Sequence, residues 1–590
     1  MSRPHTSPLS GTLFRAVCLA AACLSTVGTA AAEPAGAYHD RADRALQSLL
    51  LRFWDGGRQY LRHNYPDTGA LTGYWTYANG WEALLDNVER TGGRQYRGLI
   101  ESFYLGQDER GWYAGYYDDE CWMTQALIHA YDLTGQAKYL DKARELYADI
   151  MSAWDTGCCG ATPGGLWWDR AHTQKATAAN AGAALAGARL YLRTGEVHYL
   201  EFAEQAYSYW YDNMVSPSTF QVADHFETNG TKVWWRFTYN EGLMIGAGVE
   251  LFEATGDEEY MNQARRIANF MVANEVTPTL YGNVLYDGTN SSCGGDCSQF
   301  KGPAYRQLMR LHELDPSNTQ YLAVLQASAD AIWELARNPI STIFSTSWSG
   351  PAQSDVDQGR VNAACTALSR FAQQYEDYPG SGIPHNRFEA ENATVHHIAL
   401  AADCGDYTGW GYVGAWNADG QSVDFEVHFP AAGSYTLEFR YAAGAGNASR
   451  LIRVDGATAI PNLPFTDTGS WSVYQTRTIT RQFDAGRHMI SVVYDSSARN
   501  ANWLNLDSLT IPNLPPDQIA FTRIEAAGTG GLLLTWNTVP GQAYRLQSNS
   551  RVTGGGWSDL GLPVWATDDT LQVRVPAATD DQEFYRVVRR

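Results

Sequence analysis

Two adjacent aspartates, Asp118 and Asp119, are the residues of this chain best suited to catalysis. They lie in the segment GWYAGYYDDECW at 111–122, among the aromatic side chains of Trp112, Tyr113, Tyr116, Tyr117 and Trp122. Neighbouring carboxyl groups affect each other's ionisation, so one of them keeps its proton to a higher pH than the other. One short segment would then supply both an acid and an anion. The structural alternative is that acidic residues in the first turn of a helix simply stabilise that helix.

An acid beside an anion is what glycoside hydrolysis requires. Retaining glycosidases hold two carboxyl groups about 5–5.5 Å apart, whereas inverting enzymes hold them farther apart. Side chains of neighbouring residues at a helix end reach the shorter separation more readily. The pair therefore favours a retaining mechanism.

The composition indicates a carbohydrate ligand. Asp and Glu number 64 against 43 Lys and Arg, which gives a net charge of −21 over 590 residues. An acidic surface repels phosphate groups, and no long Lys/Arg run offsets it, so nucleic acid and anionic membranes are not expected as partners. The 20 Trp and 34 Tyr residues supply flat faces that suit the C–H faces of sugars.

Residues 1–32 have the features of a secretory signal peptide. Arg3 and Arg15 precede or flank the apolar stretch AVCLAAACLSTVG, and Ala30-Ala31-Ala32 offers a cleavage site. We expect the mature protein to be secreted or held at the cell surface, in the periplasm or outside the cell. Lipidation at Cys23 is the alternative, because LAAAC loosely resembles a lipobox. No later stretch approaches about 18 uninterrupted apolar residues, so no membrane span is expected.

Seven cysteines remain after residue 32, in a compartment that permits disulfides. Cys293 and Cys297, in SCGGDC, could close a small loop, whereas the adjacent Cys158 and Cys159 are not expected to bond each other. A zinc site is not favoured, because no second CxxC or HxxxH is present. The histidines at 63, 129 and 172 also lack paired ligand spacing, and we expect them to be structural.

Residues 38–377 have helical periodicity and a recurring helix-loop-helix phrase. NVERTGGRQY, AYDLTGQAKYL, LYLRTGEVHYL and LFEATGDEEYM each end one helix at Thr-Gly and begin the next soon after. Glycine is the residue that relieves a left-handed helix C-terminus. About six such hairpins would close into an α/α toroid, with the long connecting segments gathered at one end as a cleft.

The composition changes near residues 379–382, and short alternating strands such as QSVDFEVHF and SYTLEFRYAA follow. A second Pro-rich linker lies at 512–516. The expected architecture is multidomain: an (α/α)6 barrel catalytic domain followed by two β-sandwich domains. The expected segments are a signal peptide at 1–32, the barrel at 33–380, a β-sandwich at 385–512 and a small fibronectin-like β domain at 517–590. In the last of these, Trp536 and Trp557 are expected in the core.

Several separated motifs in the helical part resemble glycoside hydrolase family 76, the endo-α-1,6-mannanases. They are YYDDECW, GGLWWDRAHTQKATAANAGAALAGARLYLRTG, FTYNEGLMIGAGVELFEATGD and FKGPAYRQL, in this order. The resemblance covers about residues 38–377. It implies an (α/α)6 barrel and a retaining mechanism without a catalytic cofactor, with Asp118 as nucleophile and Asp119 as general acid/base.

The resemblance also indicates substrate-binding residues. These are Trp75, Tyr117, Trp167, Trp168, Tyr239 and Asn240, although the Trp residues could instead pack between helices. Lys175 and Asn180 could face the cleft or stabilise an inner helix, and Lys301 and Arg306 are expected to be structural. One departure is Glu241, where the family pattern has Gln. If Glu241 entered the cleft, it would add a third charge there.

The first β domain resembles a carbohydrate-binding module of family 6 or the similar family 35. The motifs are FEAENA, DCGDYTGWGYVGAWNADGQSVDFEV, TGSWSVYQT and NWLNLDSLTI. The resemblance implies a structural calcium ion held by Glu389, Glu391 and Asp507, since hard oxygen ligands suit that ion. It places a sugar site at Tyr412, Trp471 and Asn505. Asn502 is a rival for Asn505, Trp410 or Trp416 for Tyr412, and the rings could instead fill the core.

The sequence thus predicts a secreted, monomeric, retaining endo-α-1,6-mannanase that acts on α-mannan polysaccharide or oligosaccharide and is held there by its module. A transglycosylase on the same fold is one alternative, because water and sugar can compete for one covalent intermediate. A non-catalytic glycan-binding protein is another, although both aspartates of the pair are present. The last domain is expected to serve as a spacer or an attachment domain.

Overall fold

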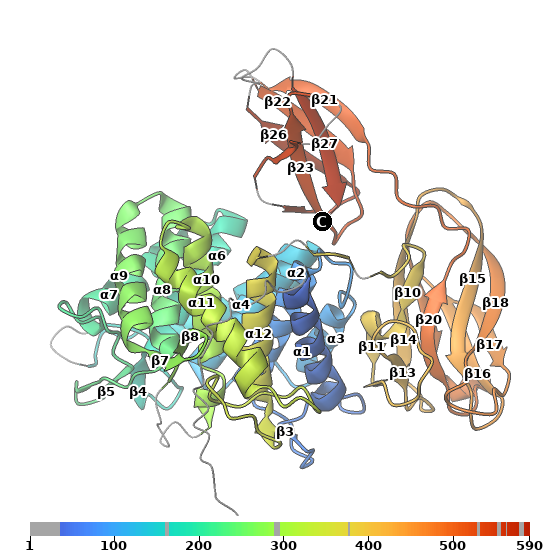
Figure 1. Cartoon of the computed structure of the whole chain (residues 1–590), viewed down its shortest axis with the longest axis horizontal. Helices are drawn as coiled ribbons and strands as arrows, with labels where there is room; N and C mark the ends of the chain where they lie inside the picture. The colour runs from blue at the N-terminus through green and yellow to red at the C-terminus, as the bar shows by residue number, and fades with distance from the viewer. Residues whose placement is uncertain are drawn as a thin grey trace, which may run out of the picture.

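The helical domain is built from an inner and an outer ring of helices. Figure 1 shows these helices beside the two β domains. The computed structural model describes residues 36–159, 164–287, 295–375, 378–380, 382–527, 531–551, 556–561, 563–576 and 583–589. The inner ring consists of α2 (Tyr74–Arg90), α4 (Tyr117–Thr134), α6 (Thr177–Thr194), α8 (Thr238–Thr255), α10 (Lys301–Leu314) and α12 (Gln358–Tyr375). The outer ring consists of α1 (Ala37–Phe53), α3 (Leu99–Asp108), α5 (Ala137–Ser152), α7 (Val197–Met214), α9 (Glu258–Asn274) and α11 (Thr319–Ala331).

Each inner helix packs on the next one, and α12 packs on α2, so the ring is closed. The predicted (α/α)6 barrel is therefore confirmed. Among the described residues, no helix combines the length and the apolar character needed to cross a bilayer. The predicted signal peptide lies outside the described residues and stays a prediction.

The inner helices are buried around nearly their whole circumference, which explains their small and apolar residues. In α6, every residue from Thr177 to Ala188 is buried. A side chain on Gly242 of α8 would come within 2.6 Å of the Ala304 Cα atom of α10, so only glycine allows these helices to approach so closely. Outer helices such as α9 bury one face only, as amphipathic helices do.

The predicted Thr-Gly helix ends are confirmed. Gly135, Gly195 and Gly256 follow α4, α6 and α8 in the left-handed conformation, and each donates its N–H to the carbonyl four residues earlier. Short hairpins occupy the connections at the other end of these helices. The largest is a three-stranded sheet of β4 (Gln174–Ala176), β5 (His225–Glu227) and β6 (Lys232–Val233).

Charged side chains join the inner helices into a closed circuit near their C-terminal ends. Each of the six helices pairs with both of its ring neighbours. The connections are α2 to α4 by Glu82 and Glu89 with His129, α4 to α6 by Asp132 with Arg193, α6 to α8 by Arg189 with Glu250, α8 to α10 by Glu253 with Arg310, α10 to α12 by Glu313 with Arg370, and α12 to α2 by Arg370 with Glu89.

Arg306 adds a further connection between inner helices, because it links α10 to α2 by ion pairs. Its guanidinium lies 2.7 Å from Asp86 and 3.6 Å from Glu82, and all three residues are buried. Burial alone would lower the pKa of His129, but Glu82 and Glu89 raise it to about 9, so the imidazole is charged at neutral pH. Glu82, Asp86 and His129 come close enough together to hold a metal ion. Arg306 pairs with Asp86 and Glu82, and the charged His129 pairs with Glu82, so the cluster is an ion-pair network.

The large β domain is a sandwich of two sheets. The first sheet has the order β12 (Ala399–Ala401), β13 (Tyr412–Gly414), β20 (Asn505–Thr510), β15 (Gly433–Ala442), β18 (Gln475–Phe483), with β10 (Arg387–Glu389) beside β20. The second has the order β11 (Thr394–His396), β14 (Ser422–Phe429), β19 (Gly486–Val493), β16 (Ala448–Val454), β17 (Ala457–Phe465). Alternate residues of β14 are buried, as the alternating sequence predicts.

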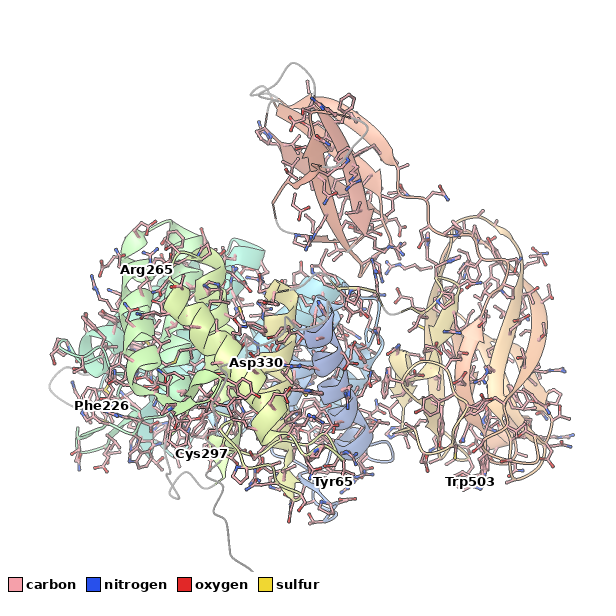
Figure 2. The ribbon with its side chains drawn as sticks, in the orientation of Figure 1. Tyr65, Phe226, Arg265, Cys297, Asp330 and Trp503 are labelled. Carbon is pink, nitrogen blue, oxygen red and sulfur yellow. A yellow bond between two sulfur atoms is a disulfide. The ribbon has the colours of Figure 1, made fainter. Side chains whose placement is uncertain are left out.

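The sandwich docks on the barrel through backbone contacts. The indole N–H of Trp54 donates to the Ile398 carbonyl at 3.1 Å, and the Val395 N–H donates to the Ser102 hydroxyl at 2.9 Å. The apolar residues of the barrel and of the sandwich form one continuous core. Figure 2 shows Cys297 at the lower edge of the barrel and Trp503 at the lower edge of the sandwich, on the same side of the molecule.

The C-terminal domain consists of two smaller sheets. One has the order β21 (Phe521–Ala527), β22 (Gly531–Asn537), β26 (Thr570–Val575). The other contains β23 (Ala543–Asn549), β24 (Ser558–Asp559), β25 (Val564–Trp565) and β27 (Phe584–Arg589). Trp536 lies in its core as predicted, but Trp557 is half-buried, 4.4 Å from the Arg586 guanidinium, so its core assignment was wrong. The resemblance to fibronectin-like domains stays a prediction.

The circuit predicts a large loss of stability when one buried charge is left alone. We expect Arg306→Met to lower the free energy of unfolding by about 3–5 kcal/mol, because Asp86 remains buried without its cation. The matched control is Arg44→Met, which breaks the exposed Arg44–Asp40 pair and should cost less than about 1 kcal/mol. Urea unfolding of both variants at neutral pH measures the difference. Equal losses would show that the circuit contributes no more than a surface pair.

Candidate active site

A cavity of about 500 Å³ opens at the end of the barrel where the inner helices begin. Backbone N–H groups are unpaired at a helix N-terminus, and the helix dipole is positive there, so this end favours negative charge. First-turn residues of five inner helices line the cavity: Trp75, Asp118, Asp119, Ala178, Tyr239 and Pro303. The connecting segments supply Tyr116, Trp168, Gln174, Ala176, Asp224, Trp235, Phe237, Asp296 and Phe300, and Trp122 comes from the second turn of α4.

Asp118 is held as a hydrogen-bond acceptor. Its Oδ2 atom accepts the indole N–H of Trp168 at 2.7 Å, and its Oδ1 atom accepts the backbone N–H of Asp119 at 2.9 Å. Removal from water raises the pKa of Asp118, while these two hydrogen bonds oppose the rise because they stabilise the anion. Asp118 is therefore the member of the pair that ionises more easily.

Asp119 has an environment that favours the protonated form. Removal from water, followed by the charges of Asp118, Asp296 and Glu120, raises its pKa well above the ordinary aspartate value. The two neighbouring carboxyl groups thus differ, as the sequence predicts for a coupled pair. The pKa of Asp118, raised to about 7, leaves it partly ionised at neutral pH, whereas Asp119 keeps its proton.

Two further carboxyl groups line the cavity, and the sequence analysis did not single them out. Asp296, in the short helix Asp296–Ser298, has a pKa raised by desolvation in spite of a hydrogen bond from Trp75. Asp224 is buried and accepts the Tyr239 hydroxyl at 2.8 Å, the Asn240 amide at 3.1 Å and the His225 imidazole at 2.7 Å. Both residues come from irregular connections, where helical periodicity gives no information about side-chain direction.

Aromatic rings form much of the cavity wall. Of the predicted substrate-binding residues, the structure places Trp75, Trp168 and Tyr239 in this wall. The Tyr116 and Trp168 ring centroids lie 4.7 Å apart, and those of Tyr239 and Phe300 lie 4.5 Å apart. Trp235 also lines the cavity and is 43% exposed, so its ring is available to a ligand.

The three other predicted substrate-binding residues lie behind the wall. Tyr117 is buried, and the Arg170 guanidinium lies 4.8 Å from its ring. Trp167 is buried and stacks on His172 with ring centroids 4.7 Å apart. Asn240 is fully buried and contacts Asp224. Each is next in sequence to a lining residue but is not itself part of the cavity lining, and its predicted contact with substrate stays a prediction.

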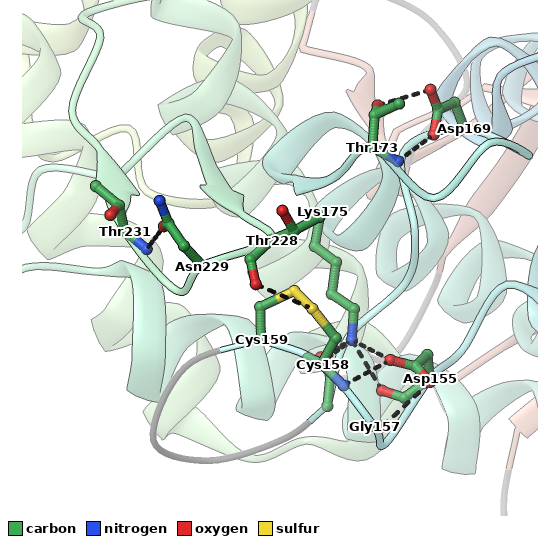
Figure 3. The surroundings of a disulfide bond; sticks show 11 residues. Asp155, Gly157, Cys158, Cys159, Asp169, Thr173, Lys175, Thr228, Asn229 and Thr231 are labelled. Carbon is green, nitrogen blue, oxygen red and sulfur yellow. Dashed lines mark hydrogen bonds and ion pairs between the residues drawn. A yellow bond between two sulfur atoms is a disulfide. The ribbon is translucent and has the colours of Figure 1, made fainter.

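Lys175 does not face the cavity (Figure 3). Its ammonium donates to the Asp155 carboxylate at 3.0 Å and to the carbonyls of Cys158 and Gly164, so it anchors the segment around residue 158. Cys158 and Cys159 form a disulfide with Cα atoms 3.2 Å apart and a cis peptide bond between them. The expectation that these two do not bond each other was wrong.

Three other residues discussed in the sequence analysis, Asn180, Lys301 and Arg306, make structural contacts. Asn180 accepts the Leu166 N–H and donates to the Leu166 carbonyl, Lys301 pairs with Asp287, and Arg306 belongs to the ion-pair circuit. Glu241 is buried and does not line the cavity. Cys297 is disulfide-bonded. Cys293 lies outside the described residues, so the predicted Cys293–Cys297 loop stays a prediction.

The predicted sugar site of the module lies at one end of its first sheet. A Cβ atom at Gly414 would lie 2.8 Å from the Asn505 amide oxygen and 3.1 Å from the Tyr412 ring, so these two side chains are adjacent. Asn505 pairs with Ala442 across the sheet, and a Cβ atom at nearby Gly444 would lie 2.8 Å from the Trp471 ring. Tyr412 is buried and its hydroxyl donates to Asp403, whereas Trp471 is half-buried. Of the rivals, Trp410 and Trp416 are buried, and Asn502 donates to the Ala445 carbonyl.

The three predicted calcium ligands gather around Thr408 and Gly409. The Thr408 hydroxyl donates to Glu389 and to Asp507, and Glu391 accepts the Trp410 N–H. All three carboxyl groups are buried. Arg387 lies 2.8 Å from Glu389 Oε1 and Arg440 lies 2.8 Å from Asp507 Oδ2, whereas Glu391 Oε2 finds no hydrogen-bond donor among the described residues. Desolvation, followed by the charge of Glu389, raises the pKa of Glu391 well above its ordinary value. A buried carboxylate oxygen without a donor fits the needs of a calcium ion.

Comparisons with known proteins agree with this division. Residues 37–378 match the family described as glycosyl hydrolase family 76, and residues 389–513 match the carbohydrate binding module of family 6. Mannan endo-1,6-alpha-mannosidase DCW1 of Saccharomyces cerevisiae is 28% identical over 210 residues, which is 33% of this chain and 45% of that protein. A cycloisomaltooligosaccharide glucanotransferase of Niallia circulans is 35% identical over 177 residues, which is 30% of this chain and 18% of that protein. The chain thus matches less than half the length of either relative.

Solved structures resemble the helical domain. The Lin0763 protein of Listeria innocua is 26% identical with a TM-score of 0.52, over 56% of this chain and 96% of that chain. An inactive variant of the GH76A alpha-1,6-mannanase of Salegentibacter, in complex with alpha-1,6-mannotriose, is 22% identical with a TM-score of 0.51, over 57% of this chain and 99% of that chain. The second likeness shows the fold. Because the matched family covers more than half of its residues, the chain belongs to glycosyl hydrolase family 76.

Proposed function

We propose that this protein is a secreted retaining endo-α-1,6-mannanase, which hydrolyses α-1,6-linked mannan through a covalent mannosyl-enzyme intermediate. The observation that carries the proposal is the contrast between Asp118 and Asp119 on the wall of an aromatic cavity. Asp118 accepts two hydrogen bonds, and Asp119 has a raised pKa beside other carboxyl groups. Membership of family 76, with curated relatives named mannan endo-1,6-alpha-mannosidase, supports the substrate.

The two carboxyl groups would act in two displacement steps. In the first, an Asp118 oxygen attacks the anomeric carbon while Asp119 gives its proton to the departing glycosidic oxygen. In the second, the Asp119 carboxylate takes a proton from water, and that water oxygen attacks the same carbon and releases Asp118. Two inversions at one carbon retain its configuration. The Trp168 N–H would hold the Asp118 carboxylate in position before the attack and again when the second step releases it.

The cavity wall would bind the sugar rings. Indole and phenol rings such as Trp75, Trp168 and Tyr239 present flat faces to the C–H groups of mannose. Asp224 and Asp296 can accept hydrogen bonds from sugar hydroxyl groups. The open end of the cavity, with Trp235 exposed, suits a polymer that continues beyond the site of cleavage.

The sandwich would hold the enzyme on its polysaccharide, using Trp471, Tyr412 and Asn505. Asn502 and Trp471 contact the same turn at 444–447, and Trp503 beside it is 42% exposed. Trp503 and Cys297, the neighbour of cavity-lining Asp296, lie on the same side of the molecule in Figure 2. A polysaccharide on that side could therefore contact both domains.

The catalytic pair can be tested with linear α-1,6-mannan and with an aryl α-mannoside. We expect the wild type to release α-anomeric oligosaccharides first, and Asp118→Ala and Asp119→Ala each to lose at least about 10³-fold in kcat/KM. Azide should rescue Asp119→Ala with the aryl substrate as the α-mannosyl azide, and Asp118→Ala as the β-mannosyl azide. Nuclear magnetic resonance distinguishes the two anomers. Reversed anomers would exchange the roles of the two residues.

The same reactions separate the alternatives. If the wild type elongates added oligosaccharides and releases none to water, the protein is a transglycosylase. If mannan is bound and remains uncut, the protein is a glycan-binding protein.

The hydrogen bond from Trp168 to Asp118 should set the acidic limit of activity. In Trp168→Phe the ring remains but the donor is lost, so the pKa of Asp118 should rise by about 1–2 units. The acidic limb of kcat/KM against pH should move to higher pH by the same amount. Trp167→Phe is the matched control, because its indole lies behind the wall. An unmoved limb in Trp168→Phe would rule out Asp118 as the group that must ionise.

A structural calcium ion in the module is part of the proposal. Glu389, Glu391 and Asp507 would hold it, and its charge would stabilise their buried carboxylates. We expect a chelator to lower the melting temperature of the module's transition, and added calcium to restore it. In Glu391→Gln the chelator should have a smaller effect. An unchanged melting temperature in the wild type would exclude the ion.

A further inference from the structure

Two buried carboxyl groups that the proposed mechanism does not use, Glu241 and Glu275, lie within hydrogen-bond reach of each other and outside the cavity lining. Glu241 belongs to the first turn of α8, and Glu275 follows the last residue of α9. They are 1% and 2% exposed. With both groups ionised, Glu241 Oε2 and the two Glu275 oxygens find no hydrogen-bond donor among the described residues.

The surrounding charges do not neutralise this pair. Asp287 adds a third negative group nearby, and it is itself paired with Lys301 at 3.1 Å. Arg236, on the exposed segment before α8, is the cation that faces Glu275. Two unpaired carboxylates buried side by side are very unfavourable, because each has lost its hydration and repels the other.

A proton between the two groups removes this penalty. One protonated carboxyl can donate a hydrogen bond to the other, which satisfies an otherwise unpaired oxygen. Desolvation raises the pKa of Glu241 to about 8, and desolvation followed by the charge of Glu241 raises the pKa of Glu275 well above its ordinary value. The pair thus keeps a proton at neutral pH.

This pair is connected to the active site through the backbone. The Oε1 atom of Glu241 accepts the Val222 N–H at 2.9 Å. Asp224, two residues later, lines the cavity and accepts the Tyr239 hydroxyl. Tyr239 lies two residues before Glu241 on the same helical turn and also lines the cavity. Glu241 is therefore connected to both cavity-lining residues, to Asp224 through the hydrogen bond from Val222 and to Tyr239 along the helical turn.

We propose that Glu241 and Glu275 share a proton and form a positioning pair, which fixes the Asp224–Tyr239 wall of the cavity and releases it when the proton is lost at alkaline pH. The functional part of this inference rests on the proposed function. Its structural part does not, because the shared proton and the held Val222 N–H require no substrate.

The first test is the pH dependence of stability. A carboxyl whose pKa is raised by folding keeps a proton that the unfolded chain releases above about pH 4.3. The wild type should therefore lose stability as the pH rises from there to about 8, the pKa of Glu241, and beyond it while Glu275 still holds the shared proton. Glu275→Gln keeps a hydrogen-bond donor but cannot ionise, so its melting temperature should fall less over this range.

Two further variants make this test specific. Glu241→Gln removes the other titrating carboxyl of the pair, so it should also reduce the fall in melting temperature with rising pH. Glu258→Gln, at the exposed start of α9, is the matched control and should leave the slope unchanged. Identical slopes in the wild type and in Glu275→Gln would overturn the shared proton.

Hydrogen exchange tests the release of the wall. Above pH 8, the amide of Val222 should exchange faster in the wild type than in Glu275→Gln, by at least about fivefold after correction for the intrinsic rate. Equal protection in both proteins would overturn the positioning role.

Ligand binding tests the consequence for function. In Asp118→Asn/Asp119→Asn, neither proposed catalytic carboxyl titrates, so calorimetry with α-1,6-mannotriose reports the rest of the cavity. Affinity should fall by about tenfold between pH 6.5 and pH 9.5, and by less than about twofold when Glu275→Gln is added. Equal decreases would overturn the inference. If neither variant binds mannotriose at any pH, the proposed substrate is wrong. The melting and hydrogen-exchange experiments then still test whether Glu241 and Glu275 share a proton and hold the Val222 N–H.

Discussion

The closed circuit of ion pairs near the C-terminal ends of the inner helices is the constraint on which the barrel depends. Each helix contributes charges that pair with those of its two ring neighbours, so a helix that shifts or rotates breaks ion pairs on both of its sides. With one end of every inner helix fixed in this way, the opposite ends converge on a common point. That point is the cavity, where first-turn residues of five helices meet.

Buried carboxyl groups at the two ends of the barrel have pKa values shifted in opposite directions. At the circuit, Glu82 is buried beside Arg306 and His129, and these cations lower its pKa to about 2 against the effect of desolvation. At the cavity, the donors to Asp118 are an indole and a backbone N–H, which stabilise an anion less than a full charge does. The pKa values of Asp118 and Asp119 therefore rise. Burial is common to both ends, and the presence or absence of cations decides whether a carboxyl group is purely structural or able to carry a proton.

The features that could be predicted from the sequence are those that depend on residues close together along the chain. Helical periodicity and the Thr-Gly ends gave the barrel, because both depend on neighbouring residues alone. The Asp118–Asp119 pair was visible for the same reason. Asp224 and Asp296 were not, since their positions depend on how loops distant in sequence fold over the helix ends. Trp167 and Trp168 show the limit most clearly: they are adjacent and identical, and only the backbone path sends one behind the wall and the other to Asp118.

The C-terminal domain lies against the end of the barrel that carries the circuit. Arg545 and Trp565 of this domain line the charged cavity of about 830 Å³ that contains the ion pairs. Its backbone contacts the barrel where the Ala543 N–H donates to the Gly92 carbonyl, directly after α2. A cover over a charged cavity reduces its exposure to water, and less water strengthens each ion pair within it. The domain thus lies over the end of the barrel opposite the candidate active site.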